Sequence, residues 1–226
     1  MSTQEDSSSG FGSGRFNLMV FPGPYCPGGY KKNPKRPYIF NRKQTIKAEG
    51  IGKTDRSFIA HVELTAAEAA AADADGIIVI TMGTAKKTVS EGFNPMPAAR
   101  NLTVVGSAAG ISGNVIVTGK NMAGETISET FALAGTDQKT GSKAFASISS
   151  VEVPARNAAG DAVQVGWGVK FGIPYKLGLN TVLAAYVNGA KEGSFTVTVS
   201  AEALESNTIQ MNTTPAGKAA DYFLIV

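Results

Sequence analysis

The first candidate for chemistry is the glycine-rich stretch GSAAGISG, which places Gly106, Gly110 and Gly113 between two apolar runs. Glycine loops can bind phosphate through their backbone amides, but a P-loop needs a Lys followed by Ser or Thr. A dinucleotide-binding loop needs a helix directly after it. This loop has no Lys or Arg, and the strand-like NVIVTG follows it. We therefore interpret it as a connection between β-strands whose glycines supply positive φ angles.

His61 is the only histidine of the chain, and Cys26 is the only cysteine. One cysteine excludes an internal disulfide and a thiolate metal cluster, and one histidine excludes a His-rich metal site. A Ser-His-Asp triad could use only His61, which lies among apolar residues in SFIAHVEL. We interpret His61 as a structural or exposed strand residue and Cys26 as a small apolar filler. The sequence thus predicts no catalytic residue, no cofactor and no metal, and a protein that is not an enzyme.

Two acidic pairs could also take part in chemistry. Asp73 and Asp75 lie at an expected helix end, and Glu125 and Glu129 are spaced to share one face of an expected strand. Two carboxylates on one face could flank a sugar or a cation. A solvated face is the favoured interpretation, because no further ligand accompanies them.

A third candidate is the segment 16–60, which is rich in aromatic, basic and proline residues. Its prolines leave no helical or strand period. Its aromatic residues need burial on the chain's own body or on another subunit. Basic and aromatic residues together can also bind nucleic acid, but the apolar FNLMVF has no use there, so protein docking is favoured. The expected docking residues are Phe16, Phe21, Tyr25, Tyr30, Lys31, Lys32, Lys35, Arg36, Tyr38, Phe40, Arg42 and Lys43.

Composition and charge indicate the class of fold that carries these candidate residues. The 226 residues include 26 glycines and only 17% charged residues, which favours a turn-rich β protein. The net charge of +3 combines a basic segment 1–60 with a mildly acidic remainder. Residues 1–15 are expected to be a disordered tail. The polar start lacks the features of a signal peptide and no apolar run reaches about 18 residues, so we expect synthesis in the cytoplasm and no membrane partner.

The elements that must position these residues are mostly strands. Thr65 and Glu68 form a capping box before an alanine run, which predicts one short helix over about 66–74 that ends at Gly76. Beyond it, apolar and alternating runs predict strands with turns between them, including a bulge near Ser149 and a hairpin at Asn188-Gly189. A second hairpin turn is expected near 121–124. The expected fold is all-β, an antiparallel β-sandwich or barrel over 61–226 with this helix and the extended N-terminal arm.

The block from Asn94 to Thr181 reads NPMPAARNLTVVGSAAGISGNVIVTGKNMAGETISETFALAG and continues TGSKAFASISSVEVPARNAAGDAVQVGWGVKFGIPYKL. It resembles a recurrent segment of structural proteins of tailed-bacteriophage virions, in particular head decoration (cement) and other capsid-associated proteins. The resemblance covers about two-fifths of the chain and is carried by the whole block, not by a single motif. It implies a β fold and a place in the virion.

The function expected from the resemblance is capsid decoration. Such a protein would bind the major capsid protein on the outer capsid surface, assemble as a homo-oligomer, which we expect to be a trimer, and stabilise the head without binding nucleic acid. One alternative is another virion component, such as a tail tube subunit, a head fibre base or a minor capsid protein. A further alternative is a carbohydrate or host-surface binding module with Trp167, Tyr175 and Tyr186 as aromatic platforms.

Overall fold

The computed structural model describes residues 46–48, 52–54 and 58–226 of the chain. The chain divides into two units, Met1–Ser57 and Phe58–Val226. In the first unit, the described residues form a two-stranded antiparallel pair of β2 (Ile46–Ala48) and β3 (Gly52–Thr54). The docking residues proposed from the sequence, from Phe16 to Lys43, lie outside the described residues, and of the expected arm 16–60 the structure describes 46–48, 52–54 and 58–60.

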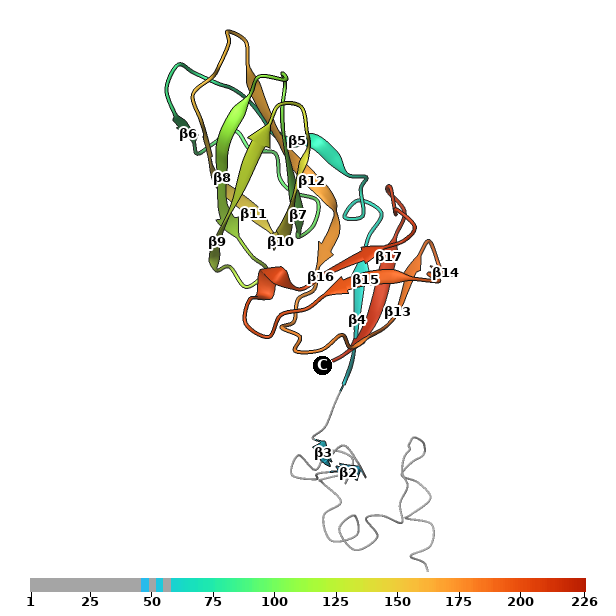
Figure 1. Ribbon diagram of the computed structural model, residues 1–226. Helices are drawn as coiled ribbons and strands as arrows, with labels where there is room; N and C mark the ends of the chain where they lie inside the picture. Colours follow the sequence, from blue (N-terminus) through green and yellow to red (C-terminus); the bar gives the residue numbers. More distant parts are fainter. Residues whose placement is uncertain (1–45, 49–51, 55–57) are drawn as a thin grey trace, which may run out of the picture. The chain divides into compact units, whose positions relative to one another are not determined.

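The second unit is an antiparallel β structure, which confirms the predicted fold class (Figure 1). Its central sheet has the order β10-β7-β12-β16-β15, with β5 also paired to β12, and it curls like half of a barrel. Its strands are β5 (Asp73–Thr81), β7 (Arg100–Gly106), β10 (Lys139–Phe145), β12 (Ala162–Gly172), β15 (Phe195–Thr198) and β16 (Thr208–Met211). A 3-10 turn, η4 (Leu204–Ser206), precedes β16.

Two four-stranded sheets accompany the central sheet. The β8–β9 sheet has the order β6-β11-β8-β9, and the β13–β17 sheet has the order β14-β13-β17-β4. The first consists of β6 (Lys87–Val89), β8 (Ser112–Lys120), β9 (Thr126–Ala134) and β11 (Ser147–Val153). The second consists of β4 (Ile59–Leu64), β13 (Val182–Val187), β14 (Ala190–Lys191) and β17 (Ala220–Ile225).

Each four-stranded sheet packs one face into its own hydrophobic core. The first core joins the inner face of the β8–β9 sheet to β5, β7 and the first half of β12, with Val117, Phe131 and Val165 in its centre. The second core joins the inner face of the β13–β17 sheet to β16 and the end of β12, with Phe171, Ile209 and Tyr222. Because β12 contributes to both cores, it connects the two halves of this unit.

The strand predictions are largely confirmed. The register of β11 shifts between Ile148 and Ser150, where the bulge was expected. Strands β8 and β9 pair as a hairpin, and the amide of Gly124 closes their turn on the carbonyl of Asn121. At the other predicted hairpin, Asn188 and Gly189 both have positive φ, as a two-residue primed turn requires. Its second strand is only the two-residue β14, because the following β15 joins the central sheet.

The predicted helix over about 66–74 is wrong: the described residues contain no α-helix, and β5 already begins at Asp73. The predicted cap does form, since the Glu68 amide donates to Oγ1 of Thr65 and the Ala69 amide donates to the Thr65 carbonyl. The chain then leaves the helical path after one turn.

Tertiary hydrogen bonds explain why this helix stops. The carbonyl of Ala69 accepts from the Gly217 amide, that of Ala70 from Nη1 of Arg100, and that of Ala71 from Nε1 of Trp167. A longer helix would need these three carbonyls for its own ladder. Gly76, the expected helix stop, instead lies in β5 beneath Trp167, where an added Cβ would come within 2.6 Å of the indole ring.

Candidate functional site

The glycine-rich loop connects β7 of the central sheet to β8 of the β8–β9 sheet. The Ser107 amide donates to the carbonyl of Ala162, and the Ser107 hydroxyl accepts from the amide of the same residue. The carbonyl of Ile111 accepts from the Gly135 amide. Of the three glycines only Gly113 has a positive φ, 108°, whereas Gly106 leaves room for the carbonyl of Gly135. The interpretation as a β connection is therefore confirmed. The expectation that its glycines supply positive φ angles holds only for Gly113.

His61 lies on β4 at the exposed face of the β13–β17 sheet. Its ring stacks on Phe223 at 4.2 Å between centroids, with 9° between the planes. Its Nδ1 lies 3.4 Å from Glu63, and its Nε2 lies 3.6 Å from Asp221. Both nitrogens therefore face carboxylates. His61 is a partly exposed strand residue, as the sequence predicts.

Glu129 departs from its predicted solvated position. It lies on the inner face of β9 with Ile127 and Phe131, and it is half-buried. Its carboxylate accepts the backbone amides of Ser142 and Lys143 from β10, the shortest at 2.9 Å. Burial raises the pKa of this carboxyl above its ordinary value, against the lowering effect of these two amides and of the Lys143 charge. Glu129 thus anchors β10 to β9.

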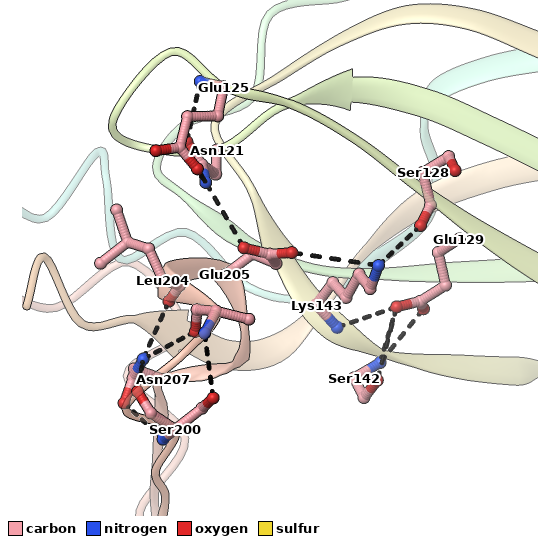
Figure 2. A network of polar contacts seen from close by, with 11 residues as sticks. Asn121, Glu125, Ser128, Glu129, Ser142, Lys143, Ser200, Leu204, Glu205 and Asn207 are labelled. Carbon is pink, nitrogen blue, oxygen red and sulfur yellow. Dashed lines mark hydrogen bonds and ion pairs between the residues drawn. The ribbon is translucent and has the colours of Figure 1, made fainter. Parts of the chain in front are cut away.

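Lys143, on β10, extends the same polar network toward η4 (Figure 2). Its ammonium group donates to the carbonyl of Ser128 at 2.9 Å and lies 3.9 Å from Oε1 of Glu205. The other oxygen of Glu205 accepts from Nδ2 of Asn121, which also donates to Glu125. Glu125 and Glu129 thus take separate partners, and they do not form the shared sugar or cation site considered from their spacing.

The side chain of Asn207 makes five hydrogen bonds around η4. The sequence analysis did not identify it. It is fully buried, and its carbonyl oxygen accepts the amides of Leu177 and Ser200. Its Nδ2 donates to the carbonyls of Ser200, Ala203 and Leu204. These bonds fix the loop before β16 to the loop after β12. A lone Asn after a polar turn gives no sequence signal for this role.

Arg100 is a second residue that sequence reasoning missed. Its side chain is buried, donates from Nη1 to the Ala70 carbonyl at 2.7 Å and stacks over Phe171 at 4.5 Å. No carboxylate pairs with it in the described part of the chain, and its Nε has no hydrogen-bond partner there. Burial lowers the pKa of Arg100 to about 10. Arg100 therefore fastens the turn after β4 to the central sheet.

The aromatic platform does not assemble from its three candidates. Trp167 is partly buried, uses its N–H on Ala71 and packs against the first core. Tyr186 lies in the β13–β17 sheet, edge-on to Phe223. Tyr175 lies in the loop after β12. Trp167 and Tyr186 therefore belong to different surfaces.

The other predicted acidic pair lies in β5 and not at a helix end. The amide of Asp75 donates to Asp73, and Asp75 accepts from Nε2 of Gln164 on β12. Across residues 58–226 and the two short strands before them, no group of three or more His, Cys, Asp or Glu could hold a metal ion. In the same described residues no helix is long and apolar enough to span a membrane.

Comparison of the chain with protein-family models, with curated proteins and with solved structures finds no match. The contacts and exposure of its own side chains are therefore the evidence for which residues have a function. The acids, amides and lysine of Figure 2 bind one another and the backbone, which makes them a structural network. The exposed surface contrasts with this network, because large apolar side chains stand open on the β13–β17 sheet. This surface is the strongest candidate for function among the described residues.

Proposed function

We propose that this chain is a structural protein of a tailed-bacteriophage virion and serves as a head decoration (cement) protein. The observation that carries the proposal is the sequence block from Asn94 to Thr181, which resembles capsid-associated virion proteins. In the structure this block contains β7 to β12 without interruption, the strands that build most of the first core. The resembling segment thus corresponds to a coherent folding element and not to scattered pieces.

The proposed mechanism is binding without chemistry. The basic, aromatic segment 16–60 docks on the major capsid protein, and many copies bridge adjacent capsid subunits on the outer surface of the head. Multiple weak contacts add up through avidity, and a partner that binds only the assembled state stabilises it. The all-β body supplies a rigid base for this segment and for contacts between copies, which we expect to include a trimer.

A charge reversal in the docking segment tests this proposal. The full chain is incubated with undecorated heads and sedimented, with Lys31, Lys32, Lys35 and Arg36 all changed to Glu in the variant. We expect binding to fall at least about tenfold, since rim charges attract an acidic surface. The matched control reverses four exposed lysines of the second unit, Lys87, Lys120, Lys176 and Lys218, and keeps its binding. Equal binding of both variants would contradict the docking mechanism.

Another virion position is the alternative, because a β body with an extended segment also suits a tail tube subunit, a head fibre base or a minor capsid protein. The number of copies per purified particle separates these positions. A decoration protein is present in proportion to the capsid subunits, whereas a fibre base or a minor protein is present in few copies. Location in the tail fraction would replace the decoration assignment.

A further inference from the structure

The outward face of the β13–β17 sheet is unusually apolar. Cross-strand partners share a face in an antiparallel pair, so Ile59 of β4 lies beside Ile225 of β17, and His61 lies beside Phe223. Leu183 stands at the bulge of β13 on the same sheet. Ile59 is 67% exposed and Leu183 is 50% exposed. Solvated faces of antiparallel sheets are normally polar, and a contiguous exposed apolar surface marks an interaction site.

Charges occupy the other end of this face in a defined order. The register places Lys191 of β14 beside Tyr186, Tyr186 beside Asp221, and Asp221 beside Glu63 of β4. One row across the sheet therefore begins with a cation at one edge and ends with two carboxylates at the other. Lys191 is exposed, and the Glu63 side chain is 74% exposed, so both can meet a partner.

This pattern is complementary to itself. A two-fold axis that lies between two copies and runs parallel to the strands exchanges the sheet edges but keeps each position along the strands. Glu63 of one copy then faces Lys191 of the other, twice, while the apolar ends face each other. We propose that the outward face of the β13–β17 sheet binds the same face of a second copy of this chain around such an axis. The two sheets then pack in the aligned manner of a β-sandwich.

The size of the face sets the expected strength of this contact. Three strands of six residues and the two-residue β14, about 4.8 Å apart, cover at most roughly 20 by 20 Å. Stable complexes bury about 800 Å² of each partner, so a face of about 400 Å² gives a weak dimer with a dissociation constant on the order of 100 µM. Such a contact is suited to act between neighbours that are already held close together. It does not depend on the virion assignment, and a two-fold contact is distinct from the cyclic contact of a trimer.

Charge exchange is the sharpest test of the two-fold arrangement. We expect the weight-average mass of the full chain in sedimentation equilibrium to rise from 23.4 kDa with concentration and to exceed about one and a half times that value at several hundred micromolar. Glu63→Lys and Lys191→Glu should each raise the dissociation constant about tenfold, because like charges then face each other. A one-to-one mixture of the two variants should associate again, and so should the double variant, since both restore opposite charges. Restored association cannot come from a variant that has lost its fold.

The apolar end is tested by Leu183→Asp, which should abolish the dimer. Val79→Asp is the matched control, because Val79 is an equally exposed aliphatic residue of β5 outside this face, and it should leave the dimer unchanged. A monomer at all these concentrations would overturn the proposal. A trimer that none of these substitutions weakens, or single variants that associate like the unchanged chain, would also overturn it. The proposal would also be overturned if substitutions on this face weakened binding to heads but left self-association unchanged, because the face would then bind the capsid.

Discussion

The two four-stranded sheets of this protein differ in what their outward faces carry. On β9 the outward residues Thr126, Ser128 and Thr130 are small and polar, and their partners on β8 are Lys120, Thr118 and a single apolar residue, Ile116. The β13–β17 sheet carries isoleucine, phenylalanine and leucine on its outward face instead. Both inward faces are buried in hydrophobic cores, so the difference lies outside the requirements of folding.

The comparison separates folding from recognition. A mostly polar outward face is compatible with a stable sheet, as the β8–β9 sheet shows. An apolar outward face contributes little to the fold of a single chain, because its side chains remain half-exposed. Its chemistry becomes useful when another surface covers it.

The largest expected effect contrasts two phenylalanines on these sheets. Phe131 is buried on the inward face of β9, and Phe223 lies partly exposed on the outward face of β17. Phe131→Ala should lower the free energy of unfolding by about 3–5 kcal/mol, and Phe223→Ala by about 1 kcal/mol at concentrations where the chain is monomeric. Denaturant unfolding followed by circular dichroism measures both values. Equal losses would contradict the distinction between the two faces.

The second effect concerns Glu129, the charged residue on the inward face of β9. Gly141 of β10 leaves the space that the Glu129 carboxylate occupies, and an added Cβ there would collide with it. Gly141→Ala should therefore displace the carboxylate from its backbone amides and cost about 1–3 kcal/mol of unfolding free energy. Gly110→Ala is the control, because a Cβ there meets only Asn157, at 3.9 Å. The control should change stability by less than about 0.5 kcal/mol.

Alternating sequence patterns determine which strand faces can be predicted from the sequence to be buried. In β9 polar and apolar residues alternate, so the pattern alone places Ile127, Phe131 and Leu133 on one face, which is the buried one. The same alternation places Glu129 inward, but a solvated role was expected for it because its partners, the amides of β10, lie 13 and 14 residues away. In β17 both faces are apolar, so the period of two cannot distinguish the buried face from the open one.

The errors share one physical cause, which is that distant groups decide local structure. The alanine run after Thr65 has the composition of a helix, yet Gly217, Arg100 and Trp167 take the carbonyls that a helix would use. Arg100 begins an ordinary strand sequence, and nothing near it indicates burial. Asn207 likewise reveals its role only when the loops around it are in place.

A third, smaller effect is the pH dependence that Glu129 introduces. The pKa of this carboxyl is raised in the folded chain, so its proton stabilises the fold below the ordinary value of 4.5. That contribution is lost as the pH rises through the folded pKa. The unfolding free energy of the unchanged chain minus that of Glu129→Gln should therefore decrease as the pH increases from about 4 toward neutrality. A difference that increases over this range would show that hydrogen bonds outweigh burial at Glu129.

The smallest effect on stability is expected when the polarity of the two outward faces is exchanged. This exchange tests most directly whether the apolar face, and not the polar one, mediates self-association. Ile225→Thr makes the β13–β17 face more polar, and Thr130→Val makes the β8–β9 face more apolar. Each should change the unfolding free energy of the monomer by no more than about 0.5 kcal/mol, because both side chains are largely outside the cores. Self-association should separate them: Ile225→Thr weakens the dimer about fivefold to tenfold, since apolar area leaves the contact. Thr130→Val leaves it unchanged, because it adds one apolar side chain beside Ile116, and the next row holds only Ser128 and Thr118, so no large contiguous apolar surface results. If Thr130→Val weakened the dimer as much as Ile225→Thr, the contact between copies would lie on the polar sheet, and the apolar face would need another partner.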